Sequence, residues 1–212
     1  MEVFKNFNIP YKYFNSIILI GNFDGLHIGH QKLFKRANEF KKKYKKKIGV
    51  ITFNPMPKMF FNKKIKHFKL MNLSQKIYQF KKQKVDFLIN QKFTKNFSKI
   101  KAEMFIIKYL NKKIKTKFLF VSNNFRFGNK REGDTNLLKS YEKKCNYKLV
   151  IPSPLKKYGK IISSTEIRKL LSRGNLSEAN KYLSRYWEIE GRVQKGRRVG
   201  GKIGFATCNI DI

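Results

Sequence analysis

The stretch Gly21-Asn22-Phe23-Asp24-Gly25-Leu26-His27-Ile28-Gly29-His30 decides the fold that this sequence predicts. It follows an apolar, β-branched run at residues 16–20 that predicts a buried strand, and it precedes residues 31–37, which predict the start of a helix. A strand, a glycine-rich turn and a helix N-terminus together form an anion site, because backbone N–H groups and the positive end of the helix dipole point to one place. We therefore expect this turn to bind a phosphate.

Two of the three histidines of the chain lie in this stretch. His27 and His30 are three residues apart, so they share one face of the first helical turn and can reach the same phosphate. Gly25 and Gly29 should leave room for an anion to approach the backbone closely. The alternative is two surface histidines on an ordinary turn, and their concentration in a chain so poor in histidine argues against it.

The composition indicates a folded protein with a large excess of basic residues. Among the 212 residues, 49 Lys+Arg stand against 13 Asp+Glu, which gives a formal net charge of +36. Such a balance usually suggests a nucleic acid or an anionic membrane as the partner. Here the lysines are scattered among abundant Phe, Tyr, Ile and Asn, which share A/T-rich codons, so a codon bias accounts for the charge without an obligate nucleic-acid partner.

The compartment is inferred from cysteine usage and from the N-terminus. Cys145 and Cys208 are too few and too far apart for a disulfide framework or a zinc site. Residues 1–5 lack the apolar segment of a signal peptide, and no stretch reaches membrane-spanning length. We expect a soluble, cytoplasmic protein without a membrane partner.

Predicted strands and helices alternate along the chain. After the first strand, turn and helix, strands are predicted at 47–53, 85–89, 117–121 and 147–151. Helices are predicted at 73–84, 102–110, 135–144, 163–171 and 178–182. This order predicts an α/β fold, with a mainly parallel sheet covered by helices on both faces. The turn at 54–57, with Pro55 and Pro57, lies beyond the carboxyl end of a strand, where an open α/β sheet builds its ligand site.

Two further segments offer polar groups to a ligand. After the strand at 117–121, Asn124 and Arg126 alternate with two phenylalanines, so one face is apolar and the other presents an amide and a guanidinium. At 163–168, three neighbouring hydroxyls and Arg168 form a second anion cradle at a helix start. A plain serine N-cap with a solvated arginine is the alternative for this second segment.

The character of the sequence changes after residue 185. Residues 187–193 predict a strand, glycines punctuate the tail, and 205–210 predict the next strand. We therefore expect a first domain at 1–186 and the truncated start of a β-rich domain at 187–212. Roughly 25 residues are too few to bury a core of their own.

Five motifs in series resemble those of the prokaryotic bifunctional riboflavin kinase/FAD synthetases. They are Gly21–His30, Thr52–Pro57, Asn124–Asp134, Ser163–Arg168 and Gly204–Asn209. They occur in the family's order and are spread over nearly the whole chain. The resemblance implies a Rossmann-like nucleotidyltransferase domain that transfers AMP from ATP to FMN, followed by a fragment of a riboflavin kinase β-barrel. It predicts FAD synthesis by this chain and no riboflavin kinase activity.

The resemblance also implies roles for individual residues. Catalytic roles fall to His27 and His30; ATP binding to Gly21, Asn22, Phe23, Asp24, Gly29, Ser164, Thr165 and Arg168; FMN binding to Asn124, Arg126 and Pro55; and a vestigial kinase magnesium site to Thr207 and Asn209. Magnesium is expected to enter with ATP, bridging its phosphates.

The sequence departs from the family pattern in places. Asn54 and Met56 stand where the family usually has Glu and His, so a polar contact near the nucleotide or flavin is expected to be missing. Other functions weighed were a related nucleotidyltransferase with a different phosphorylated acceptor, and a degenerate basic protein that binds nucleic acid. The segment at Asn124 and the tail favour the flavin enzyme over the former, and retention of both anion cradles argues against the latter.

Overall fold

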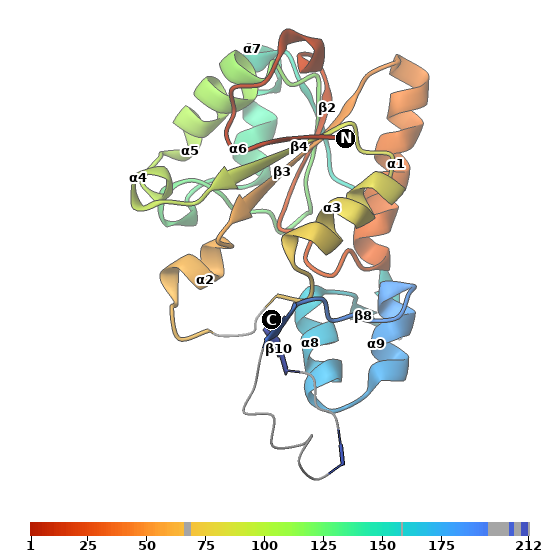
Figure 1. The fold of residues 1–212 in the computed structure, drawn as a ribbon. Coiled ribbons are helices and arrows are strands. Elements are labelled where there is room, and N and C mark those ends of the chain that lie inside the picture. Colours follow the sequence, from red (N-terminus) through yellow and green to blue (C-terminus); the bar gives the residue numbers. More distant parts are fainter. Residues whose placement is uncertain (66–68, 158, 195–203, 206–208, 212) are drawn as a thin grey trace.

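A parallel sheet forms the centre of the molecule in the computed structural model, which describes residues 1–65, 69–157, 159–194, 204–205 and 209–211 (Figure 1). Six strands lie in the order β1-β4-β3-β2-β5-β6, and every pairing is parallel. The strands are β1 (Glu2–Phe4), β2 (Ile17–Ile20), β3 (Ile48–Asn54), β4 (Phe87–Lys92), β5 (Phe118–Phe120) and β6 (Lys148–Val150). The predicted α/β fold is confirmed. The sequence did not predict β1, a three-residue edge strand that is too short for a periodic pattern.

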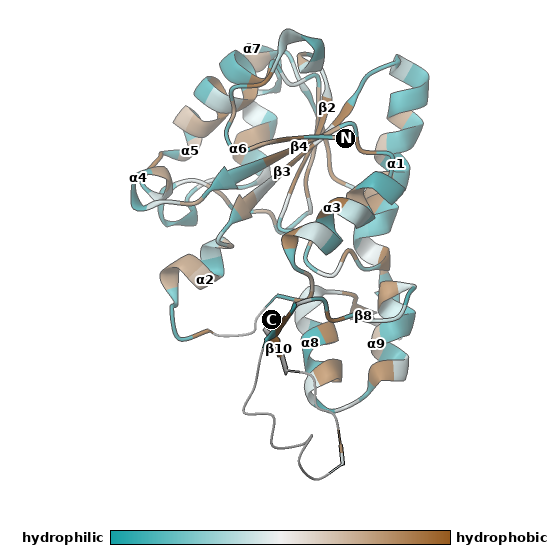
Figure 2. Cartoon of the chain, in the orientation of Figure 1, coloured by the Kyte–Doolittle hydropathy of each residue, from teal (hydrophilic) through white to brown (hydrophobic). Residues whose placement is uncertain are grey.

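Helices cover both faces of this sheet, as predicted (Figure 1). On one face α1 (Ile28–Tyr44) and α3 (Leu73–Lys82) bury Phe34 and Phe80 completely against the strands. On the other, the π-helix η2 (Phe105–Lys113) and α6 (Thr135–Ser140) bury Leu110 and Leu138. Figure 2 shows hydrophobic strands at the centre and hydrophilic residues along the outer helices. Burial of each apolar stripe against the sheet is what holds the layers together.

Several helices differ from their predicted extents. The helix predicted at 102–110 is a short α5 (Ala102–Met104) that continues into η2, and the one predicted at 135–144 divides into α6 and α7 (Glu142–Cys145). The sequence did not predict α2 (Pro57–Phe61) or α4 (Lys95–Ser98), which are too short for a helical period. The segments η1 (Tyr11–Tyr13) and η3 (Asn129–Arg131) are short 3₁₀ helices.

A helical pair forms a separate apolar cluster beside the sheet domain. It consists of α8 (Ser164–Ser172) and α9 (Leu176–Leu183), which lie side by side in Figure 1. Ile167 and Leu183 are fully buried between them, together with Leu70 from the segment before α3. Ile28, the first residue of α1, packs against the same cluster. The α8–α9 pair is therefore anchored at the start of α1.

The C-terminal segment lies against α3 before it forms a strand. The backbone carbonyls of Glu188 and Glu190 accept hydrogen bonds from Gln75 (3.0 Å) and Asn72 (3.2 Å). Strand β9 (Arg192–Gln194) pairs antiparallel with β10 (Asn209–Asp211), so the strand predicted at 187–193 begins later. Residues 206–208 of the predicted 205–210 strand lie outside the described residues. A small hairpin of β7 (Lys156–Lys157) and β8 (Lys160–Ile161) precedes α8. The predicted domain boundary at 186 stays a prediction.

The order of the strands predicts a ligand crevice beside β2. The chain runs from β2 to β3 and β4 on one side and then returns to β5 on the other side of β2. At such a reversal the loops after the two neighbouring strands separate, and ligands bind between them. The turn after β2 and the segment after β5 are therefore expected to border this crevice.

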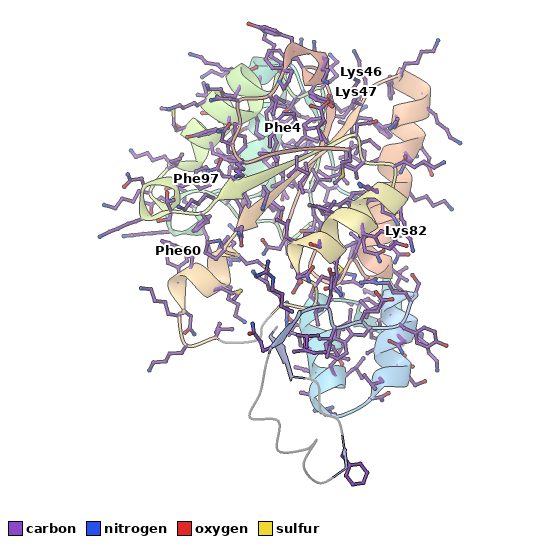
Figure 3. All side chains as sticks on the ribbon, in the orientation of Figure 1. Phe4, Lys46, Lys47, Phe60, Lys82 and Phe97 are labelled. Carbon is purple, nitrogen blue, oxygen red and sulfur yellow. The ribbon has the colours of Figure 1, made fainter. Side chains whose placement is uncertain are left out.

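Long side chains extend outward from many elements of the molecule (Figure 3). Lys46 and Lys47 lie beyond the end of α1, and Lys82 lies at the end of α3. Within the described residues, no helix is long and apolar enough to cross a membrane.

Candidate functional site

The turn between β2 and α1 adopts an unusual backbone conformation. Phe23 and Leu26 have positive φ angles of 46° and 40°, and Gly25 between them has 80°. A positive φ costs free energy for residues other than glycine, and it persists only where surrounding contacts stabilise it. A Cβ on Gly25 would lie 2.8 Å from Leu70 Cδ1, so this glycine is required for the turn and for packing on the α8–α9 cluster. The prediction that Gly25 leaves room for an anion is wrong.

Side chains from four parts of the chain hold the carbonyl groups of this turn. Lys76 Nζ donates to the Asn22 carbonyl (2.9 Å), Ser164 Oγ to that of Asp24 (2.7 Å), Arg185 Nη2 to that of Gly25 (2.7 Å), and Gln31 Nε2 to that of Leu26 (3.0 Å). In a trans peptide plane the N–H points opposite to the C=O. Each N–H group that shares one of these planes points away from the side chain that holds that plane. The N–H of Leu26 donates to the Phe23 carbonyl at 3.4 Å, so only the other three amides can face an anion.

Asp24 connects the turn to α8. It is 2% exposed, and its carboxylate accepts the Leu70 N–H at 3.0 and 3.1 Å and pairs with the guanidinium of Arg168. Ser163 caps α8 by accepting the Glu166 N–H at 3.2 Å, and Thr165 is exposed in the first turn. The predicted second cradle therefore lies against the first one. In this structure Ser164 and Arg168 contact Asp24, and their contact with ATP stays a prediction.

His27 and His30 stack face to face at the start of α1. Their ring centroids are 3.7 Å apart with an interplanar angle of 22°, which confirms that they share one face. His27 is the N-cap residue, and its Nδ1 accepts the His30 N–H at 3.4 Å. An accepting Nδ1 places the proton of a neutral imidazole on Nε2. Gly29 permits this arrangement, because a Cβ there would lie 3.1 Å from His27 Nδ1.

Both imidazoles are uncharged at neutral pH. Burial, with a smaller contribution from the nearby Arg185 cation, lowers the pKa of His27 to about 4. Burial, then His27 and Lys76, holds the pKa of His30 well below 6.5. The pair therefore offers N–H donors rather than positive charges to a ligand. Among the described residues no group bonds to the buried His30 Nδ1.

Sequence reasoning missed three buried polar residues beside this turn. Thr52 is 1% exposed, its Oγ1 has no hydrogen-bond partner among the described residues, and the pairing of Ile20 with Ile51 places it next to Gly21. Lys76 and Arg185 have no sequence signal, because a single cation cannot be recognised among 49 Lys+Arg. Thr52 stands in a motif that was recognised for its prolines.

The segment after β5 forms the other side of the crevice. Asn124 and Arg126 are exposed, while Phe125 and Phe127 stack with ring centroids 5.4 Å apart and pack on the core. The predicted alternation of polar and apolar faces is confirmed, although the segment is a turn rather than a strand end. The Asn124 Oδ1 accepts from Ser122 Oγ at 2.9 Å, and Arg126 pairs with Asp134 at 3.4 Å.

Pro55 follows β3 and is joined to Asn54 by a cis peptide bond. Asn54 is exposed, whereas Met56 is 3% exposed and belongs to the buried apolar residues. Met56 therefore offers no polar group to a ligand, and the expected loss of a contact stays a prediction.

Comparison with known proteins identifies the family. The sequence profile described as FAD synthetase matches residues 11–166, and the profile described as riboflavin kinase matches residues 183–212. The chain belongs to the FAD synthetase family. The predicted resemblance to bifunctional riboflavin kinase/FAD synthetases is thereby confirmed.

Curated relatives of this FAD synthetase domain are described as bifunctional riboflavin kinase/FMN adenylyltransferases. The protein of Buchnera aphidicola subsp. Acyrthosiphon pisum is 39% identical over 92% of this chain and 63% of its own length. That of Escherichia coli K12 is 33% identical over 92% of this chain and 63% of its own length. This chain thus spans less than two thirds of these relatives. A crystal structure described as a macrolide-efflux protein from Streptococcus pneumoniae is similar with a TM-score of 0.82 and 29% identity, covering 99% of this chain and 68% of that one.

Two residues were predicted from the last motif to hold the kinase magnesium. Asn209 begins β10, and Thr207 lies outside the described residues. In the part of the FAD synthetase chain that the structure describes, no group of three or more His, Cys, Asp or Glu side chains could hold a metal ion.

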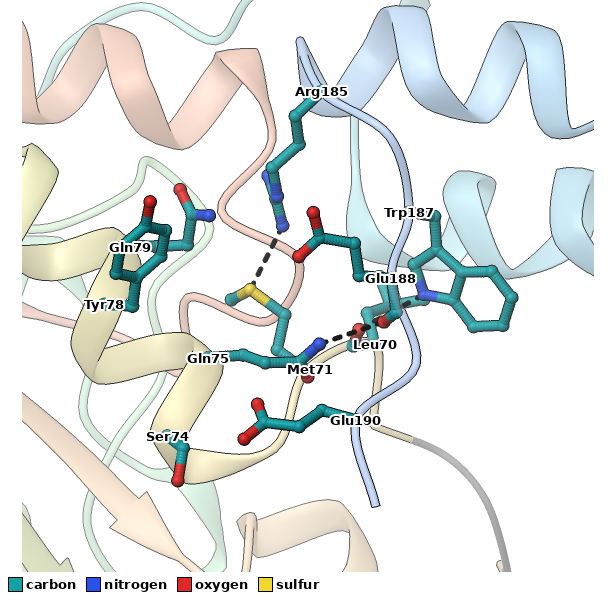
Figure 4. A pocket seen from close by; sticks show the side chains of 10 residues that line it. All are labelled: Leu70, Met71, Ser74, Gln75, Tyr78, Gln79, Arg185, Trp187, Glu188 and Glu190. Atoms are coloured by element: carbon teal, nitrogen blue, oxygen red, sulfur yellow. Dashed lines mark hydrogen bonds between the residues drawn. The ribbon is translucent and has the colours of Figure 1, made fainter. Parts of the chain in front are cut away.

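A cavity of about 310 Å³ lies behind the turn of this FAD synthetase domain, between α3 and residues 185–190 (Figure 4). Met71, Gln75 and Glu190 are among its lining residues, and none of the predicted site residues is. Arg185 lines it and also bonds to the Gly25 carbonyl, so this guanidinium lies between the cavity and the turn. The geometry of the turn, not the cavity, therefore defines the candidate site.

Proposed function

We propose that this protein transfers AMP from ATP to FMN, producing FAD and pyrophosphate. The observation that supports this most strongly is the link from Asp24 to Ser164 and Arg168, which brings the starts of α1 and α8 together beside the histidine pair. Two helix N-termini that converge on one place suit a ligand with several phosphates.

The reaction requires little covalent chemistry from the protein. An oxygen of the FMN phosphate forms a bond to the α-phosphorus of ATP, and the bond from that phosphorus to the bridging oxygen breaks. The electron pair leaves with pyrophosphate. Negative charge then increases on the leaving oxygens, and donors fixed in advance stabilise it most effectively. The Nε2–H group of neutral His27 and the N–H group of neutral His30, with the amides of the turn, supply such donors.

The flavin is proposed to enter from the side of β5. Asn124 and Arg126 are exposed beside the turn after β2, and an amide and a guanidinium suit the FMN phosphate. Pro55 follows β3, the neighbour of β2 on its other side. The three residues predicted to bind FMN thus flank the turn from both neighbouring strands.

Magnesium is proposed to arrive with ATP as part of the substrate. The Asp24 carboxylate beside the turn already bonds to Leu70 and Arg168. Mg²⁺ keeps most of its waters and binds phosphate oxygens readily, so it needs few protein ligands.

Labelled ATP tests this proposal. The purified protein is incubated with Mg²⁺ and FMN, using ATP labelled at the α-phosphate in one reaction and at the γ-phosphate in another. The α-label is expected in FAD and the γ-label in pyrophosphate. Absence of labelled FAD would contradict the proposal.

A second pair of reactions replaces FMN. With riboflavin, no labelled FMN is expected, and transfer of the γ-label to riboflavin would show kinase activity in this chain. With phosphopantetheine as acceptor, no product is expected, and preferential use of it over FMN would favour another nucleotidyltransferase.

A further inference from the structure

Two cations beside the turn, one buried and one half-buried, have no role in the activity proposed above. Lys76 is 7% exposed and is the one buried lysine among the described residues. Arg185 is half-buried and lies between the turn and the segment before α3. Burial lowers the pKa of both side chains, which reports the cost of removing a cation from water. A buried cation is retained where its hydrogen bonds compensate for that cost.

The hydrogen bonds of these cations converge on the strained turn. Lys76 Nζ reaches the Asn22 carbonyl at 2.9 Å, and Arg185 Nη2 reaches the Gly25 carbonyl at 2.7 Å. These carbonyls lie on either side of Phe23, whose φ is 46°, and of Asp24. A cation therefore holds the turn on each side of the strained Phe23.

We propose that Lys76 and Arg185 are positioning residues for adenylyl transfer, which fix the Asn22 and Gly25 carbonyls and so hold the backbone of the turn in the shape that faces the triphosphate. This inference rests on the proposed function. Both residues act through the backbone of the turn. A misplacement of about 1 Å at a reacting centre lowers a rate roughly 100-fold, so holding the turn has a large effect on rate.

Each cation also faces one of the two histidines. Arg185 lies near His27 and Lys76 near His30, and each positive charge helps to keep its imidazole neutral. The other charged groups that act on the two cations are Asp24 and Lys69 around Lys76, and Glu188 beside Arg185. The cations thus preserve the N–H donors as well as the shape of the turn.

Arg185 reaches the turn from the C-terminal part of the chain. It belongs to residues 183–212, which match the riboflavin kinase profile, and it follows α9 directly. Trp187, two residues on, donates from Nε1 to the Leu70 carbonyl at 3.2 Å, which fixes this segment against the residues before α3 (Figure 4). The FAD synthetase site is therefore completed by a residue outside the matched FAD synthetase region.

Steady-state kinetics of four variants tests the proposal. Lys76→Met and Arg185→Gln remove the charges, Lys76→Arg and Arg185→Lys retain them, and FAD formation is measured for all. We expect kcat to fall roughly 10- to 100-fold in the first two, with the KM for FMN nearly unchanged, and to recover in part in the conservative variants. Lys81→Met on α3 and Arg173→Gln after α8 are exposed controls that should match the wild type.

Imidazole NMR titration gives a second measurement that does not depend on turnover. The chain has three histidines, so few signals need to be assigned. The pKa of His27 is expected to rise in Arg185→Gln, and that of His30 in Lys76→Met, while both stay below 6.5 because burial is unchanged. If Lys76→Met fails to fold, Lys76→Arg and the Arg185 variants decide the outcome.

The possible failures are distinguishable. A wild-type protein that makes no FAD contradicts the proposed function, and the titration then tests the contacts alone. A wild-type protein that makes FAD, with variants that keep both its kcat and its histidine pKa values, overturns the positioning roles alone.

Discussion

The two sides of the crevice are built differently. The turn after β2 is held by Lys76, Ser164, Arg185 and Gln31, and its Asp24 is 2% exposed. The segment after β5 exposes its polar residues, and the polar bonds of Asn124 and Arg126 reach only Ser122 and Asp134 nearby. The proposed triphosphate side is therefore fixed by side chains from distant parts of the chain, whereas the polar bonds of the proposed acceptor side are local.

Two aspartates test this contrast most strongly. Asp24→Asn removes the ion pair between Asp24 and Arg168, and loss of one member of a buried pair costs about 3 kcal/mol. Asp134→Asn breaks the exposed pair with Arg126 but keeps the N-cap of α6, so its cost should be about 1 kcal/mol or less. Urea unfolding of both variants at pH 7 measures the difference. Equal losses of stability would contradict the contrast.

The histidine pair predicts a loss of stability in mild acid. His27 has a pKa of about 4 when folded against 6.5 in an unfolded chain, so below pH 6.5 the unfolded state binds protons that the folded state refuses. The free energy of unfolding should therefore fall as the pH drops from 6.5 to about 4, by up to about 3 kcal/mol from His27. His27→Asn keeps an N-cap acceptor, and its stability should fall less steeply over this window. Parallel slopes in urea unfolding series would contradict this.

His30 is expected to contribute directly to the rate. His30→Ala removes one N–H donor at the transition state, which raises the barrier by about 2 kcal/mol or more, or roughly 30-fold in kcat. Single-turnover FAD formation at saturating ATP and FMN measures this, with thermal unfolding as the check on folding. An unchanged rate would remove His30 from the mechanism.

Thr52 and Thr116 form a matched pair for a smaller effect. Both are buried, and neither hydroxyl has a hydrogen-bond partner in the part of the chain that the structure describes. Thr52 lies beside the turn near the carboxyl end of β3, whereas Thr116 precedes β5 at the opposite edge. Replacing either by Val should stabilise the protein by about 1 kcal/mol, since an unsatisfied buried hydroxyl costs that much or more. Only Thr52→Val should weaken ATP binding in calorimetry, and identical affinities in the two variants would exclude Thr52 from the site.

The smallest effect on folding is expected at Asn124. Asn124→Ala alters an exposed turn, so its stability should stay within about 0.5 kcal/mol of the wild type. If Asn124 binds FMN, the KM for FMN rises severalfold while the KM for ATP stays the same. A rise in both would indicate that the acceptor side also shapes the nucleotide pocket.

Local patterns were sufficient for the central part of the fold. The apolar run at 16–20, the turn and the helix start follow one another directly in the sequence. His27 and His30, whose rings stack, are only three residues apart. The parallel sheet followed from the alternation of strands and helices. These features depend on the period of neighbouring residues, which a sequence displays directly.

The missing parts depend on contacts between distant segments. Arg185 bonds to Gly25, 160 residues away, and Lys76 bonds to Asn22, 54 residues away. Gly25 was predicted to leave room for a ligand, whereas a Cβ on this residue would meet the side chain of Leu70. The neutral state of the imidazoles also escaped prediction, because it depends on burial in three dimensions.

The anchoring of residues 185–190 has a consequence for dividing the chain. Hydrogen bonds join the Trp187 indole and the main chain of Glu188 and Glu190 to residues 70–75. The segment just after the start of the riboflavin kinase match therefore packs against the FAD synthetase domain. A fragment that ended between residues 166 and 183, where the first match stops and the second begins, would lose these hydrogen bonds. A stable fragment must therefore extend beyond Glu190.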